Sequence, residues 1–474
     1  MPVNKDFYPI AGSSGAQSTG YEISQSIRFN DNDSSRLYRT PGSAGDRRTH
    51  TFSVWLKRAN LDSSGFKHIF SRSEASYFYG YYFYQDKLTM GSGSSGTEMS
   101  LRTNRLFRDP AAWYHLVLIL DTTQAVASER ARMYINGVRE LGNFNQETYP
   151  SLNAQLWMNT TSLTEIGVAN PSGSKSGYFD GLMTDIYFLD GYAYGPEYFG
   201  EFDSNGIWIP KEYEEGNYGT NGFKFTGADS SSFGTDESGT GNNFTVAGLA
   251  AHDQVLDTPT NNYCVMSPLD TFLGTNTFAD GNLLLTGSSQ VTSSTISVSS
   301  GKWYVEVRKN ANADNQIGVI TGPTNQPSSQ LGSSQFRRAW RDNNNSPQFL
   351  TDSGTAGSGT AESLSAGDIL GIALDLDNDA IYFADNNTWM NSGDPTSGSS
   401  KTGANWTDLN LYDEWRWFIG SNSNGINATW NFGQDGTFGG TETAQGNKDG
   451  NGHGNFYYAP PSGYLAVNTK NLGK

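Results

Sequence analysis

The sequence is poor in cysteine, in histidine and in charged residues. Its 474 residues include one cysteine and five histidines, and only 17% of the residues are charged. A single thiol, Cys264, cannot form a disulfide within the chain, which excludes a disulfide-linked scaffold. The histidines and the cysteine show no spacing typical of zinc ligands. We therefore expect neither a disulfide framework nor a zinc site.

Basic residues are fewer than acidic ones, and long apolar runs are missing. The chain has 31 Lys and Arg against 48 Asp and Glu, a net charge of −17. Binding to nucleic-acid phosphates requires a basic patch, so this balance argues against a nucleic-acid partner. No apolar run approaches the ~18 residues of a membrane span. The first residues (MPVNKDF) also lack the apolar core of a signal peptide. We expect no membrane insertion and no secretory signal.

Short segments of β-branched and aromatic residues recur along the whole chain, separated by clusters of Gly, Ser, Asn and Asp. Aromatic residues make up 13% of the sequence, and there are 55 glycines. Many segments alternate, so that Phe52, Val54 and Leu56 fall on one face of a strand. Helical periodicity is almost absent. This pattern predicts an all-β fold made of β-sandwich, jelly-roll-type domains.

The strand-rich segments form two blocks, residues 21–202 and 268–474. Each block exceeds the ~150 residues that readily bury a core of their own. Residues 203–267 join them and include a stretch rich in Gly, Ser and Asn at 217–243. This joining segment still contains apolar residues, so we expect an ordered bridge. Residues 1–20 contain little apolar content and are predicted to be an anchoring arm that docks to another protein or subunit.

The first block carries an ordered series of short motifs. They are residues 52–57 (FSVWLK), 68–72 (HIFSR), 113–121 (WYHLVLILD), 132–138 (RMYINGV), 165–167 (EIG) and 178–190 (YFDGLMTDIYFLD). The series resembles the laminin-G and concanavalin-A-like lectin family, a two-sheet jelly roll. Asn136 and Gly137 suit a hairpin turn that accepts positive φ. The resemblance implies binding of glycans or proteins, often with calcium, or hydrolysis of glycosides, with Trp55 and Trp113 as core residues.

The carboxylates of this block do not form the pattern of an enzyme. Glucanases of this fold carry a strand with alternating acidic residues, and no Glu-x-Asp-x-Glu occurs here. Asp180, Asp185 and Asp190 are five residues apart, so neighbours in the series point to opposite faces of a strand. We expect a protein without catalytic residues. Loop oxygens leave calcium open, but the sequence identifies no metal ligand and implies no other cofactor.

The second block carries its own motif series. It consists of residues 301–307 (GKWYVEV), 316–320 (QIGVI), 367–383 (GDILGIALDLDNDAIYF), 415–420 (WRWFIG), 430–434 (WNFGQ) and 458–464 (YAPPSGY). These motifs resemble the SPRY domain, a bent β-sandwich that binds partners through its loops. The spacing of Asp375, Asp377 and Asp379 is that of the first ligands in a calcium-binding EF-hand loop. An EF-hand also needs Gly and Glu further along the loop, where this chain has Ala380 and Asn386. A hairpin turn is the better interpretation.

Two long loops are expected in the second block, at residues 322–367 and 390–413. Side chains within or beside them are the candidate ligand-binding residues: Arg337, Arg338, Trp340, Trp389 and Trp406. Exposed tryptophans stack on sugar rings or anchor protein partners. The alternative for each tryptophan is burial in the sandwich, as expected for Trp303 and Trp417.

Residues 455–472 and the bridge from 221 to about 263 resemble tail-fibre-like structural proteins of marine tailed phages. This resemblance implies a protein of the virion surface, on the tail or the capsid exterior. Its partners would be other virion proteins and a host cell-surface glycan or protein. Phage fibres are commonly trimers, which implies a homo-oligomer. Three functions follow in order: a host-recognition adhesin, a capsid or tail decoration protein, and a polysaccharide-degrading glycosidase.

Overall fold

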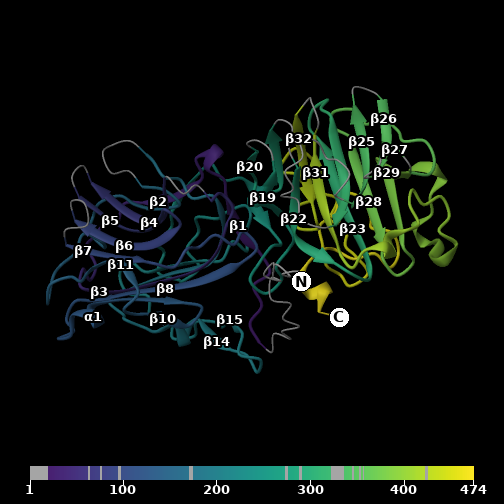
Figure 1. The fold of residues 1–474 in the computed structure, drawn as a ribbon. Helices are drawn as coiled ribbons and strands as arrows, with labels where there is room; N and C mark the ends of the chain where they lie inside the picture. The colour runs from purple at the N-terminus through teal and green to yellow at the C-terminus, as the bar shows by residue number, and fades with distance from the viewer. Residues whose placement is uncertain are drawn as a thin grey trace. The chain divides into compact units, whose positions relative to one another are not determined.

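The computed structural model describes residues 20–61, 65–74, 77–93, 98–169, 175–272, 276–287, 291–321, 336–343, 346–351, 354–355, 357–421 and 425–473. These residues divide after Thr260 into two compact units (Figure 1). Both are built from antiparallel sheets, which confirms the predicted all-β fold. No helix in the described ranges is long and apolar enough to cross a membrane. The expected anchoring arm, residues 1–20, lies outside them except for Gly20.

The first unit is a sandwich of two eight-stranded sheets, here called sheet I and sheet II. In order across sheet I lie β10 (Val138–Glu140), β9 (Ala131–Ile135), β8 (Trp113–Asp121), β3 (Thr49–Arg58), β13 (Gly181–Asp190), β1 (Ser26–Phe29) and β18 (Gln254–Val255), with β16 (Phe223–Phe225) also beside β13. Sheet II runs through β11 (Phe144–Thr148), β7 (Met99–Thr103), β6 (Lys87–Gly93), β5 (Tyr77–Tyr84), β4 (Phe66–Glu74), β12 (Thr164–Ile166), β2 (Arg36–Arg39) and β17 (Thr245–Ala247).

Few other elements complete the first unit. They are the strand pair β14 (Gly200–Phe202) and β15 (Trp208–Pro210), the single helical turn α1 (Ala127–Arg130), and 3₁₀ turns at Asp31–Asp33, Pro196–Tyr198 and Ala251–Asp253. The predicted hairpin turn is present between β9 and β10. Asn136 and Gly137 occupy it with φ of 48° and 76°, the left-handed conformation that Asn and Gly accept most readily.

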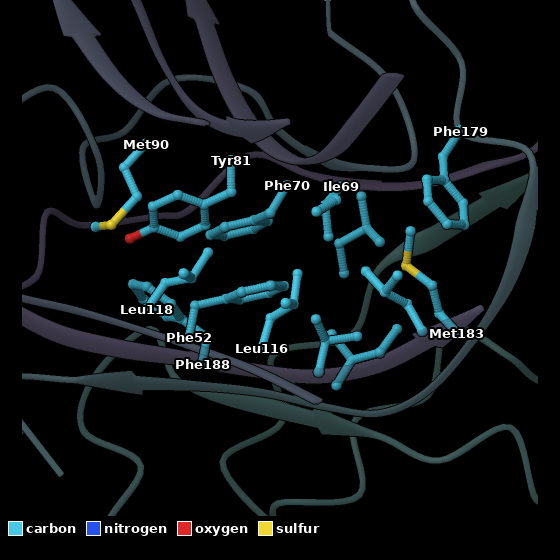
Figure 2. Close-up of a cluster of buried hydrophobic side chains, with 14 of the residues drawn as sticks. Phe52, Ile69, Phe70, Tyr81, Met90, Leu116, Leu118, Phe179, Met183 and Phe188 are labelled. Atoms are coloured by element: carbon cyan, nitrogen blue, oxygen red, sulfur yellow. The ribbon is translucent and has the colours of Figure 1, made fainter. Parts of the chain in front are cut away.

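Apolar side chains from both sheets fill the interior of this sandwich. Phe52, Val54 and Leu56 project inward from β3, as their alternation predicts. Figure 2 shows Phe52 facing Phe70 across the gap between the sheets, and the two rings stack with centroids 4.8 Å apart. Trp55 and Trp113 are also buried, but they pack on the opposite face of sheet I, in a smaller cluster with Leu182.

Most of the expected bridge is part of the first unit. Strands β16, β17 and β18 come from residues 223–255 and pair with β13, β2 and β1. Phe223, Phe225 and Phe244 lie in the sandwich core. Because isolated apolar strands gain stability only when a sheet and a core accept them, the boundary falls at residue 260 instead of at 202 and 268.

A buried carboxylate fastens the end of this segment. Asp257 is 1% exposed and accepts hydrogen bonds from Lys57 Nζ at 2.7 Å and from Trp113 Nε1 at 3.0 Å. Its main-chain oxygen accepts from the Ser26 hydroxyl at 2.7 Å. The donors belong to three different strands, β3, β8 and β1, so Asp257 ties the last residues of the first unit to sheet I.

The second unit is also a two-sheet sandwich. Its sheet III comprises β19 (Met266–Phe272), β22 (Val291–Val298), β31 (Trp415–Gly420), β24 (Asn315–Thr321), β25 (Phe336–Asn343), β26 (Ser346–Thr351) and β27 (Gly354–Thr355). Sheet IV comprises β20 (Thr277–Ala279), β21 (Leu284–Gly287), β32 (Ile426–Asn431), β23 (Lys302–Lys309), β28 (Ile369–Asp375), β29 (Ala380–Asp385) and β30 (Thr388–Trp389). The 3₁₀ turns Met390–Ser392, Pro395–Ser400 and Leu409–Leu411 lie between β30 and β31, and the helical turn α2 (Thr469–Leu472) follows β32.

Two tryptophans and an acidic run of this unit have the structural roles that the sequence predicts for them. Trp303 and Trp417 lie in its core. Asp375 ends β28, accepts a hydrogen bond from the Asn378 main-chain N–H at 3.0 Å and pairs with Lys302 at 2.9 Å. Asp379 stands in the turn with a φ of 55°. The acidic run therefore forms a hairpin between β28 and β29, as its departure from the EF-hand pattern predicts.

Glu306 holds the C-terminal segment onto sheet IV. Its fully buried carboxylate accepts hydrogen bonds from four donors: the main-chain N–H of Tyr458 at 2.7 Å and of Tyr457 at 2.9 Å, Asn431 Nδ2 at 3.1 Å and the Tyr304 hydroxyl at 3.2 Å. Burial raises the pKa of Glu306 to about 7, although the same hydrogen bonds favour the charged form.

Replacement of this carboxylate tests its role. We expect Glu306→Gln to lower the free energy of unfolding by about 1–3 kcal/mol at pH 8, because an amide NH₂ would oppose N–H donors that now meet an oxygen. The control Glu442→Gln removes a surface ion pair with Arg308 and should cost less than about 1 kcal/mol. Urea unfolding of both variants makes the comparison. The difference between the two losses of unfolding free energy should become smaller below pH 7, where Glu306 is protonated. Equal losses in Glu306→Gln and Glu442→Gln at pH 8 would contradict this role.

Three buried histidines predict how the first unit responds to acid. Burial lowers the pKa of His50, His68 and His115 to about 3, from an ordinary value near 6.5. The unfolded chain therefore takes up protons first as the pH falls below 6.5, and each histidine should remove about 2 kcal/mol of stability by pH 5. Asp185 and Asp253 act in the opposite direction because burial raises their pKa values, that of Asp185 to about 7.

The destabilising effect of the three histidines should exceed the stabilising effect of the two aspartates. The first unit is therefore expected to lose stability between pH 7 and pH 5. Pulse proteolysis in urea, with fragments assigned by mass spectrometry to residues 20–260, measures the unfolding midpoint of this unit alone. His115→Gln should remove about one third of the histidine contribution to the pH dependence, and therefore more than one third of the net pH dependence, whatever its effect on stability at pH 7. A midpoint that stays constant or rises on acidification would show that these histidines are not buried in the neutral form.

Candidate functional site

The predicted ligand-binding residues of the second unit do not form one exposed site. Arg337, Arg338 and Trp340 were expected in a loop, but they lie on strand β25. Trp340 is fully buried in the core, and its Nε1 donates to the main-chain oxygen of Glu362 at 2.9 Å. Arg338 is 4% exposed and binds both carboxylate oxygens of Asp408, at 3.0 and 2.7 Å. Alternation along the strand, which the loop assignment ignored, turns Trp340 inward.

The two remaining candidates also have structural contacts. Trp406 is 5% exposed and packs edge-on against Phe349 and Phe383, with ring centroids 5.5 and 6.0 Å away. Burial in the sandwich, the alternative interpretation, is therefore the correct one for Trp340 and Trp406. Trp389 ends the short strand β30, stays partly exposed and contacts Tyr382 at 6.4 Å. A ligand-binding role for Trp389 stays a prediction.

The acidic residues of β13 are separated as their spacing predicts. Asp180 precedes the strand and Asp190 ends it. Asp190 accepts hydrogen bonds from the main-chain N–H groups of Asp46 at 2.8 Å and Asn221 at 2.9 Å, so it holds two loops. Asp185 occupies an irregularity in the pairing of β13 with β3, has a φ of 46° and accepts a hydrogen bond from the Tyr21 hydroxyl at 3.1 Å. Within the described ranges, no group of three or more His, Cys, Asp and Glu side chains could hold a metal ion.

A buried pair in sheet I has the atoms of a nucleophilic site but not its surroundings. Ser53 Oγ lies 2.9 Å from His115 Nε2, and both side chains are fully buried. The other ring nitrogen, Nδ1, accepts a hydrogen bond from Trp208 Nε1 at 2.9 Å, where a hydrolase would place a carboxylate. His115 also stacks between Trp55 and Trp208, with centroids 4.6 and 5.9 Å away. The role of the pair is therefore structural: through its contacts with Trp208, His115 holds β15 against sheet I.

The outer surface of sheet II carries an unusual set of aromatic side chains, which we call the aromatic face: Phe66, His68, Tyr82 and Tyr84. Phe66 and Tyr84 stack with centroids 4.5 Å apart and an angle of 28° between the rings. Phe66 also lies parallel to His68, at 5.9 Å and 8°. His68 and Tyr82 are 5.2 Å apart. Phe66 is 46% exposed and Tyr84 is partly exposed, whereas His68 and Tyr82 are nearly covered.

The antiparallel register of four strands assembles this face. Phe66 on β4 is paired with Tyr84 on β5, and His68 with Tyr82. Tyr82 is in turn paired with Thr89 on β6, and Thr89 with Arg102 on β7. Cross-strand partners share one side of a sheet, so these residues form two neighbouring rows. The guanidinium of Arg102 lies over the Tyr84 ring at 4.7 Å and its Nε donates to Thr89 Oγ1 at 3.1 Å.

A tight turn fixes the register of β5 and β6. Gln85 and Asp86 form it, with φ of 53° and 57°. Asp86 is 1% exposed and binds Arg58 of sheet I at 3.0 Å and Arg108 at 2.7 Å. These ion pairs attach the turn to sheet I and to the segment that precedes β8, and they prevent a shift that would exchange the inner and outer tyrosines.

Two glycines leave space for the rings. A Cβ atom at Gly91 on β6 would lie 3.2 Å from the Tyr82 hydroxyl oxygen. A Cβ atom at Gly177 would lie 2.7 Å from His68 Cδ2 and 2.7 Å from the main-chain oxygen of Phe66. Gly177 also has a φ of 66°, and its main-chain oxygen accepts a hydrogen bond from the His68 N–H at 2.8 Å. Gly177 therefore supports both His68 and Phe66 from the neighbouring loop.

His68 and Tyr82 of the aromatic face are uncharged at neutral pH. Burial holds the pKa of His68 at about 3, so its ring is a neutral aromatic surface. Burial likewise raises the pKa of Tyr82, and the charge and hydrogen bond of Arg102 partly oppose this rise. The face therefore combines flat apolar rings with a guanidinium, that of Arg102, at its border. Such a surface can stack on a planar or ring-shaped ligand and bind its polar substituents.

The sequence carried a signal for this face that the initial interpretation missed. Strand β5 reads YFYGYYFY, with aromatic residues at odd and even positions. A strand with one solvated face should alternate between apolar and polar residues. Tyr79, Tyr81 and Phe83 belong to the core, so Tyr82 and Tyr84 are aromatic residues on the side where polar residues are expected. That departure from alternation makes this surface a candidate binding site.

Comparison with known proteins identifies the fold of the first unit. Residues 30–193 match the family model for the concanavalin A-like lectin/glucanases superfamily, Laminin_G_3. The first unit has this fold. The match includes β2 to β13 and thus every strand of the aromatic face, and it confirms the resemblance read from the motifs. No curated protein matches the chain.

Several solved structures are similar to parts of the chain. The SPRY domain of human HERC1 has 16% identity and a TM-score of 0.27, over 35% of this chain and 96% of that one. A heptameric SAP-like pentraxin from Limulus polyphemus has 15% identity and a TM-score of 0.28, over 37% and 80%. A putative carbohydrate-binding protein from Bacteroides ovatus has 13% identity and a TM-score of 0.33, over 48% and 58%.

A pair of glycine substitutions tests how the aromatic face is supported. Gly177→Ala and Gly142→Ala both place an alanine at left-handed φ, 66° and 69°, but only Gly177 has side chains and main chain within contact distance of the new Cβ. We expect Gly142→Ala to cost about 1–2 kcal/mol of unfolding free energy from backbone strain alone. Gly177→Ala should cost at least about 1 kcal/mol more, measured by urea unfolding. Equal costs would mean that the loop does not support His68.

Proposed function

We propose that this chain is a non-enzymatic glycan-binding protein that holds its ligand on the aromatic face. The observation that carries the proposal is the stacked pair Phe66 and Tyr84, of which Phe66 is 46% exposed. A pyranose ring presents a flat face of C–H groups that packs well on an aromatic ring. Its hydroxyls need donors and acceptors at the edge, and Arg102 and the exposed Gln146, paired with Arg102 across β11 and β7, provide them.

The fold of the first unit supports this proposal. The matched superfamily contains both lectins and glucanases, so the fold alone leaves the choice between binding and hydrolysis open. Hydrolysis of a glycoside requires two carboxyl groups about 5–9.5 Å apart beside the bound sugar. Among the described side chains on the outer side of sheet II, Glu165 is the carboxylate, and it is already paired with Lys175 at 2.7 Å and Arg36 at 3.7 Å. Binding without hydrolysis agrees with this arrangement.

The wider role that we propose is host recognition by a tailed-phage particle. The support is the resemblance of the C-terminal segment and of the segment after residue 221 to tail-fibre-like proteins. The chain would be exposed on the virion surface as a homo-oligomer, attached to other virion proteins, and its first unit would bind a cell-surface glycan. Mass spectrometry of purified particles, with the copy number, tests this role independently of glycan binding.

Alanine substitutions on the aromatic face test the binding site. Phe66→Ala and Tyr84→Ala should each weaken binding on a glycan array about ten- to a hundredfold, because each removes a stacking surface worth about 1.5–3 kcal/mol. Phe202→Ala is the matched control: Phe202 is 54% exposed on β14 of the same unit, away from sheet II. It should bind as the unchanged chain does. Equal binding by all three variants would overturn the proposed site.

A further inference from the structure

The outer side of sheet II is basic, although the chain as a whole is acidic. Among the side chains that the structure describes there, Arg36, Lys87, Arg102 and Lys175 are cations, and Glu165 is the carboxylate. Arg36 and Lys175 share Glu165. Four positive charges against one negative contrast with a chain that carries 31 basic and 48 acidic residues.

Two of these cations, Arg102 and Lys87, border the aromatic face. Neither Arg102 nor Lys87 forms an ion pair with any residue in the described ranges. Both are partly exposed. Lys87 is paired with Tyr84 across β5 and β6, and Tyr84 is paired with Phe66, so the lysine continues the row of the exposed rings. Arg102 lies over Tyr84 from β7. On the β6 side, the stacked rings are therefore followed by two strands, β6 and β7, that each carry a cation without an ion pair among the described residues.

The orientation of Arg102 suits an anionic ligand. Its guanidinium is held by the Tyr84 ring at 4.7 Å and by the Nε hydrogen bond to Thr89 at 3.1 Å. A guanidinium fixed in this way has lost much of its side-chain freedom before a ligand arrives, which reduces the entropy cost of binding. Its planar set of donors matches the oxygens of a carboxylate or a sulfate group, and a charge-assisted hydrogen bond is about twice as strong as a neutral one.

We infer that the aromatic face selects acidic glycans, with a sugar ring on Phe66 and Tyr84 and a carboxylate or sulfate group on Arg102 and Lys87. This inference rests on the proposed glycan-binding function and names its ligand class. It also gives the net charge a role. With a charge of −17, the remaining surface repels acidic polysaccharides, so they are attracted where the local sign is reversed. Acidic glycans should therefore bind at this face and not elsewhere.

The full-length chain can be tested by isothermal titration calorimetry with three probes: a polygalacturonate oligosaccharide, a sulfated dextran and neutral dextran. We expect at least tenfold tighter binding of one or both acidic probes than of the neutral one, and weaker binding as NaCl rises. The two acidic probes separate carboxylate from sulfate as the group recognised. Arg102→Gln should reduce acidic-probe affinity at least tenfold, and Arg102→Lys should restore only part of it because lysine lacks the planar donor set.

Arg48→Gln is the matched control. It removes the same charge from an exposed arginine that precedes β3, and should leave every affinity unchanged. The inference would be overturned if neutral dextran bound as tightly as the acidic probes and if Phe66→Ala, but not Arg102→Gln, lost affinity. The proposed function would then remain intact. Equal loss in Arg48→Gln and Arg102→Gln would also overturn it, since attraction would then be general. Absence of binding to all glycans, neutral and acidic, would contradict both proposals.

Discussion

The buried contact between Arg58 and Asp86 is the interaction on which the first unit depends most. Arg58 comes from sheet I and Asp86 from the turn between β5 and β6 in sheet II, and both side chains are 1% exposed. One ion pair therefore connects the sheets and fixes the position of a hairpin. The aromatic face derives its place from that position, because β5 pairs with β4, which carries Phe66. Arg102 follows through the pairings of β5 with β6 and of β6 with β7. Breaking such a buried pair leaves an uncompensated charge, so its geometry is rigidly maintained.

A single strand then serves the core and the surface together. Tyr79, Tyr81 and Phe83 of β5 face inward, and the hydroxyls of Tyr79 and Tyr81 approach His50 Nε2 at 3.1 and 2.8 Å. Tyr82 and Tyr84 face outward. The polar atoms of the inner tyrosines are satisfied within the core, which lets the strand be aromatic on both sides without burying unpaired hydroxyls. Tyr82 and Tyr84 of the proposed binding surface thus project from a strand whose other side is packed in the core.

Much of the fold could be predicted from the sequence, and little of the candidate site. Alternation identified the inward residues of β3, the Asn136-Gly137 turn and the hairpin at Asp375, since these depend on neighbours along the chain. The segment after residue 202 was misjudged as a bridge because its partners are distant: β16 pairs with β13, and Asp257 meets Lys57. The loop assignment of Trp340 failed because a Gly- and Ser-rich context outweighed the alternation of residues 336–343. The aromatic face depends on register across four strands, which no local pattern specifies.

The double-sided aromatic pattern of β5 has a consequence for how the chain reaches its native state. A hairpin that pairs one residue out of step would still bury aromatic rings, since Tyr82 and Tyr84 could enter the core in place of Tyr79 and Tyr81. Burial of apolar surface hardly distinguishes the two arrangements. The native register is instead selected by the turn at Gln85 and Asp86 and by the ion pair of Asp86 with Arg58, which lies on the distant strand β3. Correction of that alternative requires the hairpin to open, so the speed of folding of the first unit, more than its final stability, is set at this turn.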